Sequence, residues 1–355
     1  MAAHGAWITG SAFARCTLCL VWIGLASGGV PGPAAEPVKA GPKTETPGRS
    51  AWMRTARWGV MTHYLADWKA REANEPMSVE RWNQMIDRFD VAGLAKQLKA
   101  VGAGYYLITI GQNSGYYLAP NATYDRLAGV NPSKCSRRDL VSDVSGALRK
   151  REIKLLVYLP SGAPSGDRVA REALQWQNGP YPNKEFQVKG EQIIRDWSLR
   201  WGDEVDGWWF DGCYWPNLMY RSAEPPNFAS FATAARAGNP ASAVAFNPGV
   251  VPRILSLTPH EDYTAGEIND PNRVEIRRAV DGKIDGAQVH ILSYLGRTWG
   301  MGQPRFSTEQ VVRWSQSIHR QGGVMTWDVP IQANGLIAQP FIDQLNAVGK
   351  AMGER

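Results

Sequence analysis

Short apolar runs alternate with longer stretches of helical periodicity along the chain from residue 58 onward. The apolar runs predict eight strands, at residues 58–64, 105–110, 154–159, 207–211, 243–247, 263–267, 290–295 and 324–329. The periodic stretches predict helices at residues 91–101, 138–151, 187–201, 228–237, 308–320 and 340–352. This alternation is typical of a parallel α/β fold, and eight strands favour one (β/α)₈ barrel of the TIM type over an open doubly wound sheet.

The start of the chain differs from the rest in composition and predicts a targeting segment. Arg15 precedes an apolar run at residues 16–26, and small residues follow it. The run is too short to span a bilayer comfortably, so we expect a signal peptide at residues 1–35, a Pro/Gly-rich linker at 36–50 and one catalytic domain, the barrel, at 51–355. We therefore expect export to the periplasm or the cell exterior, without stable membrane insertion after cleavage. An uncleaved anchor is the alternative.

Charge and cysteine content exclude several classes of function. The formal net charge is +6, but Lys and Arg are interspersed with Asp and Glu, so we expect no nucleic-acid partner. The positive excess suits either an anionic polysaccharide or an ordinary solvated surface. Cys135 and Cys213 remain after cleavage and have no metal-ligand spacing, and no glycine-rich nucleotide loop follows a predicted strand. The sequence thus predicts neither metal nor cofactor, and leaves open whether the cysteines pair.

One apolar run ends in a carboxylate. Asp211 directly follows the run at residues 208–210, and Gly212 then permits a sharp turn or the close approach of a ligand. In a parallel α/β barrel the C-terminal strand ends carry the chemistry, so Asp211 is the leading catalytic candidate. A turn-capping role is the alternative, but the aromatic neighbours suit an apolar pocket that stacks on sugar rings; they are Trp208, Trp209, Tyr214 and Trp215.

Other polar and aromatic residues also fall at the predicted strand ends. They are His63, Gln112, Asn113, Tyr158, Asn247, Glu267, Arg297, Trp299 and Asp328. A sugar site requires such convergence, because hydroxyls need directed hydrogen bonds while the C–H faces of the ring stack on aromatic side chains. We therefore expect an oligosaccharide or glycoconjugate substrate. Asp328, which lies two residues before Pro330, is interpreted as a loop-capping residue outside the catalytic pair.

Retaining hydrolysis of a glycoside needs two carboxyl groups about 5–5.5 Å apart. Asp211 is the predicted nucleophile, and Glu267 is the first candidate for the acid/base, ahead of Asp270 and Glu261. Each of those three also has an interpretation as an ordinary loop carboxylate. His63 is either a hydrogen-bonding partner of a sugar hydroxyl or a structural histidine at a strand end.

These residues carry a resemblance to the alpha-L-fucosidases of glycoside hydrolase family 29. The segment Arg57-Trp-Gly-Val-Met-Thr-His63 resembles the family's first strand, and Trp209-Phe-Asp-Gly212 resembles its nucleophile strand. Further similar segments are Arg138-Asp-Leu-Val141, Thr298-Trp-Gly300, Gly322-Gly323 and Asn334-Gly-Leu-Ile337. The likeness covers roughly residues 52–352, in matching order and spacing. It implies that His63 binds the sugar, that Asp211 is the nucleophile and that Trp299 lines the pocket.

The chain departs from the family's pattern after the second strand. The family usually carries a His-His-Asp-Gly run there, where this chain has Gln112-Asn113-Ser114-Gly115. Amides still donate and accept hydrogen bonds, which favours a retained sugar site with a changed preference. Tyr64-Leu65 replaces a Trp-Gly pair, and we expect no C-terminal β-sandwich. The predicted substrate-binding set is His63, Gln112, Asn113, Tyr158, Trp209, Trp215 and Trp299.

The leading hypothesis is an exported, metal-independent retaining glycosidase, most similar to an alpha-L-fucosidase. In this hypothesis Asp211 forms a covalent glycosyl intermediate while Glu267 acts as acid and then as base. Two alternatives stay open, a glycosidase for another sugar and a barrel without catalysis that binds carbohydrate or serves as a scaffold. The sequence sets neither the sugar, the linkage nor the oligomeric state.

Overall fold

The computed structural model describes residues 48–177, 183–214, 219 and 221–353. The predicted signal peptide at 1–35, nearly all of the linker at 36–50, and Trp215 lie outside these residues. The described residues belong to one compact unit of the chain.

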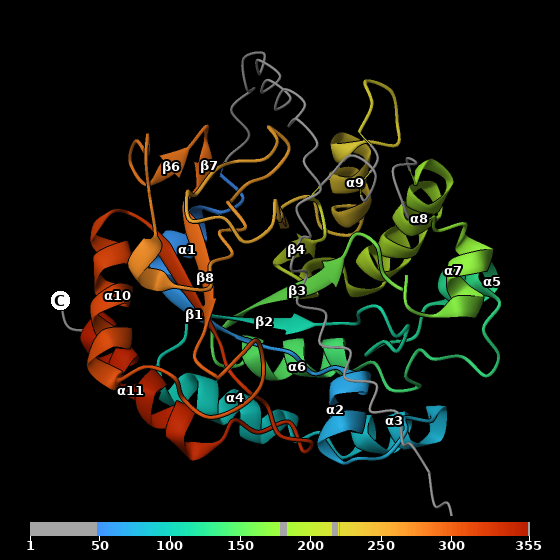
Figure 1. Cartoon of the computed structure of the whole chain (residues 1–355), viewed down its shortest axis with the longest axis horizontal. Coiled ribbons are helices and arrows are strands. Elements are labelled where there is room, and N and C mark those ends of the chain that lie inside the picture. Colours follow the sequence, from blue (N-terminus) through green and yellow to red (C-terminus); the bar gives the residue numbers. More distant parts are fainter. Residues whose placement is uncertain (1–47, 178–182, 215–218, 220, 354–355) are drawn as a thin grey trace, which may run out of the picture. The chain divides into compact units, whose positions relative to one another are not determined.

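Seven parallel strands form one curved sheet in the order β5-β4-β3-β2-β1-β9-β8 (Figure 1). They are β1 (Trp58–Thr62), β2 (Tyr105–Thr109), β3 (Lys154–Pro160), β4 (Gly207–Asp211), β5 (Ala243–Phe246), β8 (His290–Tyr294) and β9 (Val324–Asp328). Each corresponds to a predicted strand, with ends shifted by no more than two residues. A small antiparallel hairpin, β6 (Lys283–Ile284) with β7 (Ala287–Gln288), precedes β8.

The segment 262–268 closes the ring between β5 and β8 without being a regular strand. Asp262 N donates to the carbonyl oxygen of Val244 in β5 at 2.8 Å, and Leu292 N in β8 donates to that of Gly266 at 2.9 Å. The prediction of a regular sixth strand is wrong, because Gly266 has φ +61°, outside the β region. The predicted (β/α)₈ barrel is nevertheless confirmed, since this segment takes the eighth place in the ring.

Six helices match the predicted ones, and several of them flank the strands in Figure 1. They are α4 (Val91–Ala100), α6 (Leu140–Arg149), α8 (Lys184–Trp201), α9 (Phe228–Ala235), α10 (Thr308–Arg320) and α11 (Gln339–Gly353). Five helices that the pattern did not predict are α1 (Ala51–Ala56), α2 (Ala66–Glu72), α3 (Val79–Asp87), α5 (Ala122–Ala128) and α7 (Arg168–Leu174). These helices have six to nine residues, about two turns, so their helical period is weak, although α9, with eight residues, was predicted.

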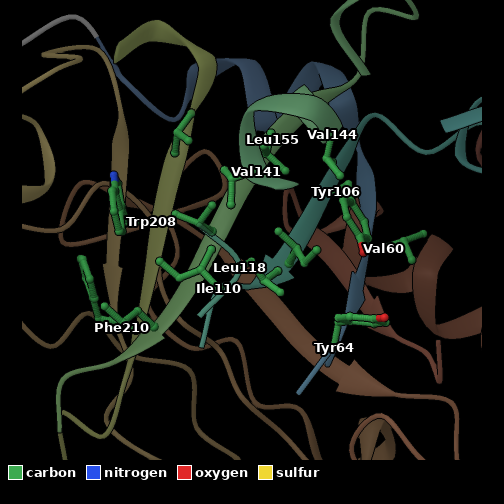
Figure 2. Close-up of a cluster of buried hydrophobic side chains, with 14 of the residues drawn as sticks. Val60, Tyr64, Tyr106, Ile110, Leu118, Val141, Val144, Leu155, Trp208 and Phe210 are labelled. Atoms are coloured by element: carbon green, nitrogen blue, oxygen red, sulfur yellow. The ribbon is translucent and has the colours of Figure 1, made fainter. Parts of the chain in front are cut away.

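Side chains alternate between the two faces of each strand, which divides the core into two layers. Figure 2 shows the layer outside the barrel, where Val60, Tyr106 and Trp208 of the strands belong to the same buried cluster as Val141 and Val144 of α6. The second layer fills the barrel interior and includes Met61, Leu107, Leu156, Trp209 and Leu292. Along β4 the side chains therefore alternate, with tryptophans in successive positions packing on opposite faces of the sheet. The expectation that Trp208 lines a sugar-stacking pocket is wrong, because this alternation turns its ring outward into the buried outer layer.

Cys135 and Cys213 are both buried and unpaired, which settles the open question of a disulfide between them. Burial raises the pKa of each thiol well above its usual range, so both are neutral apolar groups at physiological pH. Within the described ranges, no helix combines the length and apolar character needed to cross a bilayer.

Replacing Gly266 by alanine is expected to lower the free energy of unfolding by about 3 kcal/mol or more. A Cβ atom there would lie 1.8 Å from the carbonyl oxygen of His290, at a φ that disfavours side chains. The matched control is Gly146→Ala, in α6, where a Cβ meets no atom within 4 Å. The control is expected to raise stability by about 0.5–1 kcal/mol. Denaturant unfolding measures both, and equal stabilities would contradict the closure at residues 262–268.

Candidate active site

The period of the strands brings one set of side chains to the mouth of the barrel. In β4 Trp209 faces the interior, and Asp211 follows on the same face two residues later. The same step from an inward-facing residue leads to further side chains at or near the C-terminal ends of β1, β3, β5 and β9, namely His63, Tyr158, Asn247 and Asp328. Because all these strands are parallel, their C-terminal ends gather these five side chains at one end of the barrel.

Asp211 accepts hydrogen bonds from four donors. Its Oδ1 atom accepts from the backbone N of Gly212 at 2.7 Å, the hydroxyl of Tyr214 at 2.8 Å and Nδ2 of Asn247 at 2.8 Å. Its Oδ2 atom accepts from the hydroxyl of Tyr158 at 2.5 Å. Burial and the charge of Asp211 raise the pKa of both phenols well above the usual range, so both remain donors. The carboxylate is thus held in one orientation, with Oδ2 the less occupied oxygen.

Asn247 connects Asp211 to Glu267. Its Nδ2 atom donates to Oδ1 of Asp211 at 2.8 Å and to Oε2 of Glu267 at 2.5 Å. The two acceptor oxygens are therefore separated by at most the sum of these lengths, about 5.3 Å. Two carboxyl groups lie about 5–5.5 Å apart in retaining glycosidases and about 6.5–9.5 Å apart in inverting ones. The bound on these two oxygens lies closer to the retaining than to the inverting separation.

The carboxyl group of Glu267 holds its proton more tightly than an ordinary glutamate. Burial, followed by the negative charge of Asp211, raises its pKa to about 8. Asp328 adds a smaller repulsion, while the hydrogen bond from Asn247 acts in the opposite direction. At neutral pH a protonated acid therefore lies beside the carboxylate of Asp211, which is the pairing that general acid catalysis needs.

The other two acid/base candidates lie in different surroundings. Glu261 is buried and accepts hydrogen bonds from two backbone N–H groups of neighbouring loop and strand residues. Asp270 accepts from the backbone N of Asn272 at 3.0 Å and caps a short 3₁₀ turn at Pro271–Arg273. Of the three carboxyl groups, that of Glu267 is bridged to Asp211.

His63 is oriented by a buried carboxylate. Asp328 accepts hydrogen bonds from Nδ1 of His63 at 2.8 Å and from the backbone N of Gly300 at 2.5 Å. The imidazole stacks on Trp68 at 4.9 Å and meets Trp299 edge-on at 6.1 Å between ring centroids. The interpretation of Asp328 as a loop cap is therefore incomplete, because the same carboxylate also fixes the predicted sugar-binding histidine.

Tyr158 links the pocket to the interior of the barrel. Its ring stacks on Trp209, with centroids 5.2 Å apart, and its hydroxyl accepts from Nε2 of Gln112 at 3.2 Å. Trp209 is only 1% exposed and its Nε1 donates to the carbonyl oxygen of Ala265. Trp209 therefore stacks against Tyr158 from the adjacent strand, where the two residues are register partners, and its contact with a sugar stays a prediction.

The remaining predicted binding residues lie around the rim. Asn113 is exposed; its Oδ1 atom accepts from the hydroxyl of Ser165 at 3.1 Å, and its backbone carbonyl oxygen accepts from the backbone N of Gly166 at 2.9 Å. It thus braces the connection after β3. Trp299 is half-buried and packs on Tyr294 at 4.6 Å between centroids. The roles of these residues, and of Trp215 outside the described ranges, stay predictions.

Three residues of the site were not in the predicted catalytic or binding sets. Asn247 and Asp328 each follow an inward-facing residue by two positions, so the strand period was a usable signal for both. Tyr214 lies in the loop after β4, where no period applies. Its hydrogen bond to Asp211 depends on the path of that loop, which only the folded chain shows.

The described part of the chain contains no set of side chains arranged as metal ligands. No group of three or more His, Cys, Asp or Glu side chains is arranged there to hold an ion. The carboxylates of Asp211 and Asp328 are instead occupied by protein donors, as Oε2 of Glu267 is.

A sequence model of the family described as alpha-L-fucosidase matches residues 48–354, which is most of the chain. The chain belongs to the alpha-L-fucosidase family. The resemblance suggested by the short motifs is thereby confirmed. No curated protein is a significant match to its sequence.

Solved structures share the fold of this alpha-L-fucosidase family member at low sequence identity. Endo-fucoidan hydrolase MfFcnA4 of glycoside hydrolase family 107 has a TM-score of 0.67 and 20% identity, over 86% of this chain and 54% of that one. Alpha-L-fucosidase isoenzyme 1 from Paenibacillus thiaminolyticus has a TM-score of 0.60 and 19% identity, over 86% of this chain and 75% of that one. Alpha-L-fucosidase AlfC from Lactobacillus casei has a TM-score of 0.60 and 14% identity, over 85% of this chain and 97% of that one. The chain thus spans about half the length of MfFcnA4.

The raised pKa of Glu267 predicts a pH dependence of stability. The folded protein keeps this proton up to about pH 8, whereas a free glutamate loses it near 4.5, so the free energy of unfolding falls as pH rises between these values. Glu267→Gln cannot ionise and is expected to gain at least about 1 kcal/mol relative to wild type between pH 4.5 and 9. Unfolding measured across this range tests it. The control Glu185→Gln, on the exposed start of α8, is expected to follow wild type.

Proposed function

We propose that the protein is a retaining glycosidase that releases a terminal alpha-L-fucosyl residue from an oligosaccharide or glycoconjugate. One observation supports the mechanism: a single amide nitrogen, Nδ2 of Asn247, contacts both carboxyl groups and keeps the two oxygens that it contacts within about 5.3 Å of each other. Membership of the alpha-L-fucosidase family supports the choice of sugar.

In the first step Asp211 acts as the nucleophile. Its Oδ2 atom forms a bond to the anomeric carbon while the bond from that carbon to the leaving oxygen breaks. The electron pair goes to the leaving oxygen, which takes the proton of Glu267. The products are a glycosyl ester on Asp211, an ionised Glu267 and the released alcohol.

In the second step Glu267 acts as the base. Esterification neutralises Asp211, which removes one of the causes that raise the pKa of Glu267 and lets it remain ionised until water arrives. Glu267 takes a proton from the water while the water oxygen bonds to the anomeric carbon. The bond between that carbon and Oδ2 of Asp211 breaks. Asp211 regains its charge and Glu267 its proton, so the site returns to its starting state.

Sugar recognition is assigned to the residues around these carboxyl groups. His63, held by Asp328, offers its other ring nitrogen to a hydroxyl, and Trp299 offers an aromatic face. A second candidate function is hydrolysis of a different glycoside, favoured by Gln112 and Asn113, whose side chains are bonded to protein partners. MfFcnA4, named for hydrolysis inside fucoidan, shares the fold, so that polymer belongs in the substrate panel.

A binding or scaffold barrel without catalysis explains the site less well. Such a protein has no need for an acid whose pKa is raised to about 8 beside a carboxylate held by four donors. Perturbed titratable groups of this kind cluster at catalytic sites.

Export is proposed from the sequence of the N-terminus. The basic residue Arg15, the apolar run at 16–26 and the following small residues support a cleaved signal peptide. The N-terminal sequence of the mature protein from its native host tests this proposal, and an intact Met1 start in the cytosol contradicts it.

Asp211→Ala is expected to lower kcat on an aryl alpha-L-fucoside by at least about a thousandfold, because the covalent step is lost. Azide is expected to restore turnover and to yield the glycosyl azide of opposite anomeric configuration. NMR of wild-type product is expected to show the anomer of the substrate first. The control Asp270→Ala removes a carboxyl that caps a turn and is expected to keep wild-type turnover.

Outcomes of a panel of aryl glycosides and fucoidan separate the candidate functions. Activity on another sugar keeps the mechanism and replaces the specificity. Release of the opposite anomer contradicts retention. Glycan binding without release of any sugar supports the non-catalytic barrel.

The kcat/KM of the wild-type enzyme is expected to fall above about pH 8. Ionisation of Glu267 in the free enzyme removes the proton that the leaving oxygen needs. Initial rates between pH 5 and 10 measure this fall, the alkaline limb of the pH profile of kcat/KM. Glu267→Gln is expected to lack it on a substrate whose leaving group departs without protonation, and a flat wild-type profile to pH 10 counts against Glu267 as the acid.

A further inference from the structure

Asn247 is a fully buried asparagine whose backbone and side chain are both fixed. Its backbone N donates to the carbonyl oxygen of Phe210, the residue before Asp211, at 2.8 Å. Its side-chain Oδ1 accepts from the backbone N of Gly249 at 3.0 Å, which identifies the other terminal atom as the nitrogen. Gly249 has φ +99° and packs under the ring of Tyr214. The amide is therefore held in one orientation by the main chain.

This orientation directs both hydrogens of the Asn247 amide to carboxyl groups. One N–H reaches Oδ1 of Asp211 at 2.8 Å and the other reaches Oε2 of Glu267 at 2.5 Å. A primary amide nitrogen has two donors, so its donor capacity is fully used by these two groups. Both donors of the amide are thus bound to the two carboxyl groups that the mechanism uses, which indicates more than a scaffolding role.

We propose that Asn247 is a positioning residue that holds the nucleophile and the acid/base at the separation of the two-step reaction and turns Oδ2 of Asp211 toward the anomeric carbon. This inference rests on the proposed function. With Asn247, Gly212 and Tyr214 all donating to Oδ1, that oxygen is the non-reacting one. Oδ2 has the single phenol of Tyr158 and forms the bond to the sugar.

Asn247 also acts on the proton of Glu267. The groups that face this carboxyl are Asp211 from β4, Asp328 from β9, the neutral phenol of Tyr214 and the Asn247 amide. The two aspartates repel the ionised form, whereas the hydrogen bond from Asn247 favours it. Loss of the amide is therefore expected to raise the pKa of Glu267 further. The ionised form needed as a base in the second step becomes harder to reach.

The test compares Asn247→Leu, which has a similar size and no donor, with Asn247→Asp, which has the same shape and adds a charge. Both are expected to lower kcat/KM roughly tenfold or more and to move its alkaline limb upward by about one pH unit or more. A limb that stays at the wild-type pH in both variants, or rates within about twofold of wild type, overturns the proposal.

A matched control separates positioning from stability. Asn239 lies before β5, at the opposite end of the same strand, and its Nδ2 donates to the carbonyl oxygen of Val205 at 3.0 Å. Asn239→Leu is expected to lower the melting temperature and leave the alkaline limb in place. A shifted limb in this variant would assign the effect to general destabilisation and overturn the proposal.

A second measurement distinguishes failure of this inference from failure of the proposed function. If wild type hydrolyses no glycoside, the proposed function fails, yet the pH dependence of unfolding still reports on Glu267. The fall in wild-type stability that ends near pH 8 is expected to extend to higher pH in both Asn247 variants. An unchanged pH range in both variants shows that Asn247 does not act on Glu267, whatever the substrate.

Discussion

A β-strand repeats every two residues, and in a closed parallel barrel this period decides which side chains reach the mouth. Met61, Leu156 and Trp209 fill the interior, and the residues two positions beyond them are His63, Tyr158 and Asp211. The packing of the barrel and the composition of the site are therefore one constraint. If the register of any of these strands shifted by one residue, a polar side chain of the site would point outward toward the helices instead of into the mouth of the barrel.

Closure of the ring explains why Glu267 and Asp211 are neighbours. Glu267 lies on the irregular segment between β5 and β8, and Gly266 before it adopts a backbone conformation that a regular strand lacks. The break ends the strand pattern yet keeps the hydrogen bonds of Asp262 and Gly266 to the strands on either side. Asn247, from the adjacent strand end, then spans the distance from this segment to Asp211.

The surroundings of the two carboxyl groups differ, so that Asp211 is charged while Glu267, beside it, keeps its proton. Four donors surround Asp211, two of them phenols whose own pKa values are raised by burial and by its charge. Glu267 receives a donor from Asn247 and meets the field of its neighbour, so its pKa rises to about 8. This asymmetry is the arrangement expected when one group attacks and the other protonates.

The sequence by itself determined seven strands, the longer helices, the barrel and the place of Asp211, because these depend on periodicity within one segment. It did not predict five of the short helices or the irregular path at Gly266, since both contain too few residues for more than a weak period. Only the tertiary structure decided that Trp209 stacks against Tyr158, that Asp328 holds His63, and that Asn247 joins the two carboxyls. Each of these is a contact between residues far apart in the chain, and their distance and orientation are set by packing of the whole barrel.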